Sequence, residues 1–357
     1  MSLSIGIVGL PNVGKSTLFN SLTDAGALVA NYPFATIDPN VGIVEIPDPR
    51  LRVLADLYKT DNIVPATLNI TDIAGLVAGA SQGEGLGNQF LSHIRSCQAI
   101  VQVVRAFNDS SVTHVDNEHS PKKDIDVINT ELVLADLQTV EKRLIKIQKE
   151  AKANPKLASV VKDYLKAKEI LDSGEPLWSS NEDFESLAEA QLLTLKPVVY
   201  LFNLDEGDLS NDELKAKLST LVAPTDSLFV SAKLEAELTG LDEVDKQELL
   251  ESYGQKESGL NLIINELYKL LGLQSYLTAG EKEVRAWTVK QGATAPQAAG
   301  VIHGDFERGF IAAEVVSYQD LVNSGSLTSA RAAGKVRTEG KTYIVNNDDV
   351  IEFRFNV

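Results

Sequence analysis

The sequence predicts an α/β protein with a mostly parallel sheet, an inserted helical segment and a β-rich region near its end. Three observations support this fold class. The apolar segment LSIGIV (3–8) leads into a glycine loop and an amphipathic helix, which is a strand–loop–helix unit. A long run with helical periodicity then separates two of the later strands. From about residue 275, short segments with strand-like alternation predominate.

Composition indicates a globular protein of two or three domains. The chain has 357 residues, of which 44% are hydrophobic and 23% are charged. No apolar run approaches the roughly 18 residues that cross a membrane, and the N-terminus lacks the basic leader of a signal peptide. A single cysteine, Cys97, excludes an internal disulfide framework and is expected in the core. We therefore expect a cytoplasmic protein without membrane contact.

Charge is distributed unevenly along the chain. The net charge is −17, yet residues 142–168 contain nine Lys or Arg and two acids, which gives that segment +7. The rest therefore carries −24, from −17 minus +7. An acidic body is repelled by nucleic acid, so DNA is not an expected partner, whereas the basic segment suits the phosphates of RNA.

The first glycine loop matches a phosphate-binding pattern. Gly9 to Ser16 reads G-x-x-x-x-G-K-S between a strand and a helix. In this context backbone N–H groups surround an anion at the helix N-terminus. We expect Lys15 to reach the β- and γ-phosphates and Ser16 to bind Mg²⁺. The nucleotide-binding set in this loop is Asn12, Val13, Gly14, Lys15, Ser16 and Thr17.

An acidic group on a second strand should complete the part of the site that binds the phosphates. The strand ATLNIT leads to Asp72, which is expected to hold Mg²⁺, and Gly75 can offer its N–H to the γ-phosphate. Between the two motifs, the Pro-bounded loop NYPFATIDPN (31–40) carries Thr36, the expected third Mg²⁺ ligand in the triphosphate state.

Four motifs together resemble the Obg family of translation-factor-class GTPases. They are GLPNVGKST (9–17), NYPFAT (31–36), DIAGL (72–76) and GASQGEGLGNQFLSHIR (79–95). The segment NLDE (203–206) and the C-terminal region narrow the resemblance to the YchF, or Obg-like ATPase, subfamily. The resemblance covers essentially the whole chain. It implies a P-loop G domain and a preference for ATP over GTP.

The residues of the segment expected to read the base do not by themselves decide between ATP and GTP. Guanine presents two donors that a carboxylate can accept, but Glu206 is one methylene longer than the usual Asp. Asn203 can serve either purine, and Leu204 can cover the base face. A second loop, Ser231-Ala232-Lys233, is expected to close over the base. ATP is the expected substrate, and GTP is the alternative.

Hydrolysis needs a group that positions water, and the usual Gln after D-x-x-G is replaced by Leu76. The resemblance implies that a His in the loop after the strand AIVQVV takes this role, which selects His114. His119 in the same loop is a rival. With Lys15 and Gly75, His114 forms the expected catalytic set. Asn12 lies where some members of the class bind K⁺, which adds K⁺ to Mg²⁺ as an expected ion.

Residues 130–172 are expected to form an antiparallel helical hairpin. An apolar seam in steps of three and four precedes a break at Asn154-Pro155, and a second helix follows. A further helix is expected near 183–195. The basic segment straddles the turn, so we expect a basic tip that contacts the ribosome or its RNA. The alternative is an ordinary solvated helical face.

The tail reads as strands VRAWTV, GFIAAEVV and KTYIVNNDDVIEFRF, with a short helix between Ser317 and Gly325. It resembles a TGS domain, a β-grasp module with RNA- or ribosome-linked roles. The expected domains are a G domain (1–129 and 197–274), a helical coiled-coil insertion (130–196) and a TGS domain (275–357).

Together these features predict a Mg²⁺-dependent ATPase that acts as a nucleotide-dependent switch and associates with the ribosome. Two alternatives are a GTP-selective GTPase and a nucleotide-gated regulator that binds protein partners during stress, with incidental hydrolysis.

Overall fold

The computed structural model describes residues 4–24, 40–73, 86–108 and 120–356. They form two compact units: residues 1–44 with 68–263, and residues 45–67 with 264–357. No helix in the described ranges is both long and apolar enough to cross a membrane.

The first unit is built on a six-stranded sheet with the order β2-β4-β1-β5-β6-β7. Its central strands run parallel: β1 pairs with β4 and β5, and β6 pairs with β5 and β7. Every residue of β5 and β6 is buried, as expected for strands covered on both faces. This confirms the predicted α/β class. The strands are β1 (Ser4–Gly9), β2 (Asn40–Glu45), β4 (Thr67–Asp72), β5 (Ala99–Arg105), β6 (Val198–Asn203) and β7 (Ser227–Val230).

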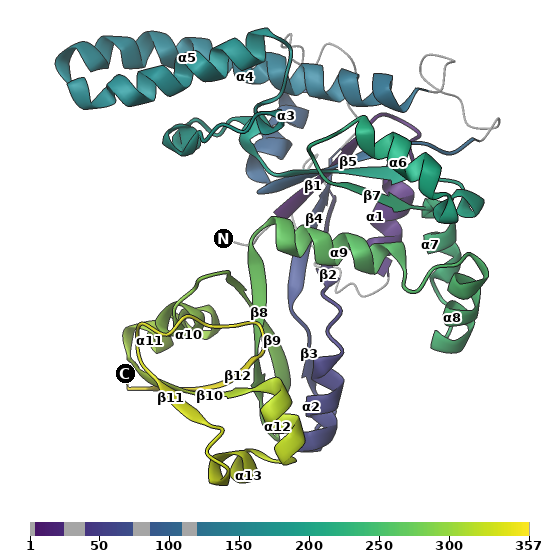
Figure 1. Cartoon of the computed structure of the whole chain (residues 1–357), viewed down its shortest axis with the longest axis vertical. Helices are drawn as coiled ribbons and strands as arrows, with labels where there is room; N and C mark the ends of the chain where they lie inside the picture. Colours follow the sequence, from purple (N-terminus) through teal and green to yellow (C-terminus); the bar gives the residue numbers. More distant parts are fainter. Residues whose placement is uncertain (1–3, 25–39, 74–85, 109–119, 357) are drawn as a thin grey trace. The chain divides into compact units, whose positions relative to one another are not determined.

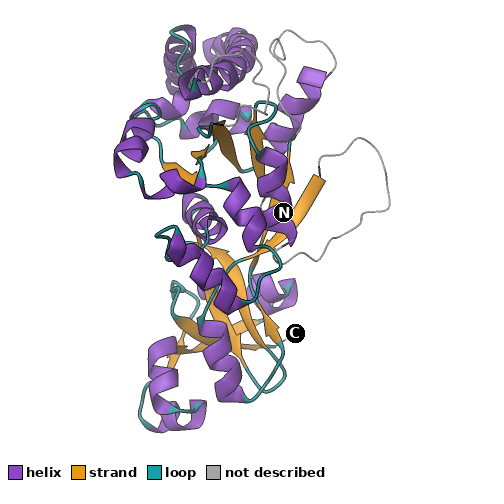
Figure 2. Cartoon of the chain, turned by 90° about the vertical axis from the view of Figure 1, so that its right-hand side faces the viewer, coloured by secondary structure: helices purple, strands orange, loops and turns teal. Residues whose placement is uncertain are grey.

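Helices flank this sheet, as Figures 1 and 2 show. Leu18 and Leu22 of the first helix are buried, and so is the expected core residue Cys97. The helices are α1 (Lys15–Asp24), α3 (Leu86–Ser96), α6 (Asp212–Thr220), α7 (Ala232–Leu238), α8 (Glu243–Ser252) and α9 (Gly259–Leu270), with the 3₁₀ turn η6 (Glu206–Ser210).

A helical hairpin lies between β5 and β6 in the sequence. It consists of α4 (Pro121–Ala153), the 3₁₀ turn η2 (Pro155–Leu157) and α5 (Ala158–Asp172). Figure 1 shows the two helices packed side by side. Their shared core contains Val140, Leu144, Tyr164 and Leu171, so the predicted hairpin and its break at Asn154-Pro155 are confirmed.

Two details of the predicted hairpin were wrong. The first helix begins at Pro121 rather than 130, because Ser120 caps its N-terminus and proline occupies its first turn. The return segment near 183–195 contains only the 3₁₀ turns η4 (Glu185–Ala190) and η5 (Leu193–Leu195), after η3 (Leu177–Ser179). Buried Asp136 of α4 accepts hydrogen bonds from the backbone N–H groups of Leu193 and Thr194, which fixes this irregular path.

The second unit is built on another six-stranded sheet, with the order β11-β10-β12-β8-β9-β3. The pairs β10–β11, β10–β12 and β8–β9 are antiparallel, whereas β12–β8 and β3–β9 are parallel. Its strands are β3 (Ile63–Val64), β8 (Leu273–Ala279), β9 (Val284–Lys290), β10 (Phe310–Ser317), β11 (Arg337–Glu339) and β12 (Asp349–Phe355). Its helices are α2 (Arg50–Tyr58), α10 (Ala295–Ile302), α11 (Gly304–Arg308), α12 (Tyr318–Ser324) and α13 (Leu327–Ala332).

In the C-terminal region, the predicted short helix is confirmed, but the predicted last strand is too long. The expected short helix is α12, which Ser317 caps and which Gly325 ends with a φ of 70°. The expected strand over 341–355 was too long. Only Asp349–Phe355 pairs as a strand, because Asn346 and Asp349 form a turn before it.

The segment 45–67 packs with the second unit, whereas the sequence placed it in the G domain. Ile63 pairs with Val284 at the edge of the sheet. The Arg50 guanidinium donates a 2.5 Å hydrogen bond to the backbone carbonyl of Asn347. These contacts join residues more than 200 positions apart, so no local pattern reports them. The other boundaries of the predicted domains stay predictions.

Candidate nucleotide site

The phosphate loop joins the carboxyl end of β1 to the first residue of α1. Gly9 is required because a Cβ there would lie 2.9 Å from the backbone oxygen of Val103 on β5. Gly14 has a φ of +90°, and a side chain at this position would collide with the amide of Asn203. Asn12 also adopts a left-handed conformation, with a φ of 65°. The loop is therefore curled as an anion-binding turn requires.

Lys15 and Asp72 form an ion pair at this end of the sheet. Lys15 begins α1, and Asp72 ends β4 in register with Ile7 of β1. The structure thus brings together two residues predicted for the phosphate end from positions 57 apart in sequence. Ser16 and Thr17 are exposed next to them at the helix N-terminus.

These residues fit a magnesium ion. The hydroxyl of Ser16 and the carboxylate of Asp72 are oxygen donors, and Mg²⁺ is held by one or two carboxylates together with substrate phosphates. Within the described ranges, no group of three or more His, Cys, Asp or Glu forms a separate metal cluster. One protein carboxylate with phosphate oxygens is the donor set that P-loop proteins use for Mg²⁺.

At the other end of the site, Asn203 connects two loops. Its side-chain Nδ2 donates a 3.0 Å hydrogen bond to the Val13 carbonyl, and its Oδ1 accepts a 2.9 Å hydrogen bond from the Ala232 N–H. Asn203 is only 4% exposed. It therefore fixes the phosphate loop and the loop of Ser231–Lys233 relative to each other. Its expected role in reading the base stays a prediction.

Glu206 forms a 2.6 Å ion pair with Lys233, from the loop that is expected to close over the base. The hydrogen bond from Lys233 holds the pKa of the Glu206 carboxyl below its usual range, with a smaller opposing effect of burial. Reciprocally, the hydrogen bond to Glu206 raises the pKa of Lys233. The carboxylate that distinguishes this motif is thus ionised and already engaged.

The remaining predicted base-site residues lie close by. Ser231 caps α7, with its hydroxyl accepting from the Leu234 N–H. Leu204 is 1% exposed, and its backbone N–H donates to the Val230 carbonyl, so its side chain packs inside the protein. Its expected role as a cover for the base stays a prediction.

Sequence reasoning missed two carboxylates that shape this end of the site. Asp205 accepts a 2.9 Å hydrogen bond from the Asn108 N–H and so fixes the segment that follows β5. Glu235 on α7 is buried and accepts a 2.6 Å hydrogen bond from the Gly259 N–H at the start of α9. Asp205 belongs to the NLDE segment (203–206), so the sequence could have indicated it. Glu235 belongs to no motif, so no sequence signal indicates it.

Three predicted site residues lie outside the described residues: Thr36, Gly75 and His114. The rival His119 lies outside them as well. Their roles stay predictions.

Comparison with known proteins identifies the family. The chain is 52% identical to "Ribosome-binding ATPase YchF" from Bacillus subtilis, over all of both chains. This chain belongs to the YchF family. It is 48% identical to the protein of the same name from Escherichia coli O157:H7, again over the full length of both.

Family models and solved structures agree with this assignment. Residues 4–162 match a family described as "50S ribosome-binding GTPase", and residues 273–356 match the YchF-GTPase_C family, described as a protein of unknown function. The YchF GTPase structure from Schizosaccharomyces pombe superposes with a TM-score of 0.85 at 39% identity, covering 99% of this chain and 98% of the other. A GTP-binding protein from Pyrococcus horikoshii, at 21% identity and a TM-score of 0.62 over 99% of this chain and 100% of the other, supports the fold alone.

Proposed function

We propose that the chain is a cytoplasmic, Mg²⁺-dependent ATPase that prefers ATP to GTP and acts as a nucleotide-dependent switch on the ribosome. The observation that carries the preference is at the base-binding end. The two groups that a guanine would need are both engaged within the protein: the Ala232 N–H by Asn203, and the Glu206 carboxylate by Lys233.

Purine chemistry connects these contacts to ATP. Guanine carries an acceptor at O6 and donors at N1 and N2. Its O6 would accept a hydrogen bond from the Ala232 N–H, and its N1 and N2 would donate to the Glu206 carboxylate. Guanine would have to displace Asn203 from the Ala232 N–H and share the Glu206 carboxylate with Lys233, and polar contacts that are displaced are costly. Adenine makes neither demand. The second hydrogen of the Asn203 Nδ2 can serve N7, which is an acceptor in both purines.

The phosphate end supports the dependence on Mg²⁺. Lys15 and Asp72 neutralise each other in the described structure. The phosphates of ATP would draw Lys15 away and leave the Asp72 carboxylate facing more negative charge. Ser16, Asp72 and Thr36 would hold Mg²⁺, which would supply the compensating positive charge there. Asn12 is the residue beside which K⁺ would add to this charge balance.

Ribosome association rests on the relatives' names and on the hairpin. The proteins from Bacillus subtilis and Escherichia coli that resemble this chain over its full length are named ribosome-binding ATPases. Lys149, Lys152 and Lys156 are exposed next to the turn of the hairpin, where they can approach RNA phosphates.

Calorimetric titration of nucleotide-free protein with ATP and with GTP tests the proposal, in Mg²⁺ with either K⁺ or Na⁺. We expect clearly tighter binding of ATP. Tighter binding of GTP would overturn the base assignment and favour the second candidate, a GTP-selective enzyme. That candidate is supported by the carboxylate retained at Glu206 and by the name YchF GTPase that the Schizosaccharomyces pombe protein carries. Equal affinity in K⁺ and Na⁺ would remove K⁺ from the site.

A further inference from the structure

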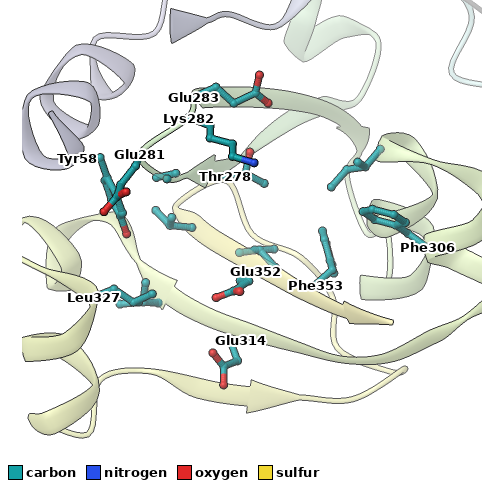
Figure 3. Close-up of a pocket in the computed structure, with 16 residues that line it drawn as sticks. Tyr58, Thr278, Glu281, Lys282, Glu283, Phe306, Glu314, Leu327, Glu352 and Phe353 are labelled. Carbon is teal, nitrogen blue, oxygen red and sulfur yellow. The ribbon is translucent and has the colours of Figure 1, made fainter. Parts of the chain in front are cut away.

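The second unit contains a pocket of about 410 Å³, which Figure 3 shows. Four glutamates line it, and one lining lysine and the three arginines Arg285, Arg331 and Arg354, each ion-paired with a lining glutamate, balance their charge. This pocket therefore favours neither a cationic nor an anionic ligand. A carboxylate without such a balance lies in the first unit. Glu235 on α7 is only 3% exposed and forms no ion pair within the part of the chain that the structure describes.

Glu235 caps the N-terminus of another helix. The first N–H groups of a helix have no partner inside that helix. At the start of α9, the Gly259 N–H donates a 2.6 Å hydrogen bond to Glu235 Oε1, and the Leu260 N–H also stabilises this carboxylate. The next N–H, that of Asn261, donates a 3.2 Å hydrogen bond to the Ser258 hydroxyl. The first turn of α9 is therefore tied to α7, and Figure 1 shows this end of α9 beside α7.

The approach of α9 to this contact is too close for a side chain at Gly259. A Cβ there would lie 2.7 Å from Val230 Cγ1 and 2.9 Å from Glu235 Oε1. Val230 ends β7, and Glu235 lies in the first turn of α7. The N-terminus of α9 thus contacts residues on both sides of the loop Ser231–Lys233.

Short backbone connections link Glu235 to that loop. The Glu235 N–H donates a 3.0 Å hydrogen bond to the Ser231 carbonyl, and the Ala232 N–H donates a 2.9 Å hydrogen bond to Asn203 Oδ1. Because one turn of helix joins these groups, a displacement of Glu235 would move Ala232 relative to Asn203.

Capping of α9 alone does not account for a buried carboxylate at this position. Oε2 of Glu235 is buried without a hydrogen-bond partner in the described structure, which costs free energy. A short polar side chain next to the helix can cap it without this cost, as Ser258 does for the Asn261 N–H. The feature specific to Glu235 is that it connects α9 to α7.

We propose that Glu235 is a positioning residue for the nucleotide base: by binding the N-terminus of α9, its carboxylate holds α7 and the loop Ser231–Lys233 in place against Asn203. This rests on the proposed function in one respect, namely that a purine is bound at this loop, and it does not depend on which purine is preferred. Without the contact, a nucleotide would lose interactions with its base and keep those with its phosphates.

Calorimetry with ATP and with inorganic tripolyphosphate, both in Mg²⁺, separates these two parts of the nucleotide, because tripolyphosphate has no base. Glu235→Ala should lower ATP affinity about tenfold and leave tripolyphosphate affinity within about twofold of the wild type. Glu235→Gln keeps an acceptor for the Gly259 N–H and should restore ATP affinity to within about twofold. The control, Glu257→Ala, removes an exposed carboxylate two residues before α9 begins and should change neither affinity.

Gly259→Ala tests the same contact from the side of α9. Its Cβ should push α9 away from Glu235, so we expect the same selective loss of ATP affinity. Adding Glu235→Ala should weaken ATP binding no further than the more affected of the two single variants, because both substitutions break one contact. Gly280→Ala, where a Cβ would meet nothing within 4 Å, is the control for the added methyl group.

Three results would overturn the proposal. An equal loss of ATP and tripolyphosphate affinity in Glu235→Ala would mean a general effect on the fold. Unchanged ATP affinity in that variant would mean that the loop is held without Glu235, and additive losses in the double variant would mean that Glu235 and Gly259 act separately. A wild type that binds GTP more tightly than ATP would overturn only the proposed ATP preference, and GTP would then take the place of ATP in this comparison.

Discussion

At the end of the first unit where we propose that the base binds, Glu206 and Lys233 form an ion pair. Lys233→Gln removes this partner, so the pKa of Glu206 should return toward its ordinary value and the carboxylate should become available to guanine. We expect the ratio of ATP to GTP affinity to fall, by a few-fold at most because Lys233 is solvent-exposed and its ion pair is screened. Calorimetry with both nucleotides measures this ratio. Lys256→Gln, an exposed lysine elsewhere in the first unit, is the control and should leave the ratio unchanged.

Glu235 is the residue whose protonation should affect stability near neutral pH. Burial raises its pKa to about 7, although the N–H groups of Gly259 and Leu260 oppose this shift. One of its oxygens, Oε2, is buried without a hydrogen-bond partner in the described structure. A carboxyl whose pKa is higher in the folded state binds more protons than the unfolded chain does. Its contribution therefore declines as the pH rises from the unfolded pKa toward 7.

The substitution Glu235→Gln should remove this pH dependence. Relative to the wild type, the variant should gain on the order of 3 kcal/mol in unfolding free energy between pH 4.5 and 7, and no more above that. Urea unfolding of both proteins across this pH range provides the comparison. A difference between them that stays constant with pH would show that Glu235 has an ordinary pKa in the folded protein.

His114 is the proposed water-positioning residue. Its replacement in His114→Ala should lower the rate of ATP hydrolysis by about 100-fold or more, the usual contribution of a positioned acid–base group. The affinity for ATP should be unchanged, because the phosphate loop and Asn203 are intact. His119→Ala is the matched comparison. Normal turnover of the His114 variant, with loss in the His119 variant, would transfer the role to the rival.

Among the structural elements, the helical hairpin carries the basic segment of the chain. Lys166 and Lys168 pair with Glu182 and Glu141, both at 2.5 Å, whereas Lys149, Lys152 and Lys156 near the turn have no recorded ion pair in the described ranges. Lys142, Arg143 and Lys162, farther from the turn, are exposed as well, so basic charge available to a partner extends along the hairpin from its tip. We propose that this surface contacts phosphates, and an ordinary solvated helical face stays the alternative.

Charge reversal at the tip tests this element. Changing Lys149, Lys152 and Lys156 to Glu should weaken co-sedimentation with ribosomes. It should also lower the slope of log affinity against log salt by about one for each phosphate that the tip no longer neutralises. The control reverses Lys215, Lys217 and Lys256, an equal change of charge in the first unit. If the tip variant sediments like the wild type, the hairpin does not carry the interaction.

At the scale of the whole molecule, the chain passes from the first unit into the second and back between two segments of the nucleotide site. Residues 45–67 belong to the second unit, yet they join β2, which follows the loop with Thr36, to β4, which ends at Asp72. The second unit is thus covalently linked to both segments expected to respond to the γ-phosphate. Movement of either segment on hydrolysis would be passed on to α2 and β3.

Hydrogen exchange can detect this transmission. We expect the backbone amides of Arg50–Val64 to exchange at different rates with a non-hydrolysable ATP analogue and with ADP, each with Mg²⁺. In Lys15→Ala, which should bind nucleotide weakly, the two rates should be equal. Identical exchange of this segment in the wild type with both nucleotides, at saturation, would mean that the second unit does not sense the nucleotide.

The sequence by itself determined those parts of this protein that depend on local chemistry. The phosphate loop needs particular residues at fixed spacing, the hairpin needs its seam and its Asn154-Pro155 break, and α12 needs Ser317 and Gly325. Tertiary structure alone decided which polar groups are already paired. The Lys15–Asp72 and Glu206–Lys233 pairs, the contacts of Asn203, and the inclusion of residues 45–67 in the second unit all join distant positions. The physical reason is that burial and hydrogen-bond competition arise only when separate segments pack together, and they leave no periodic mark in the chain.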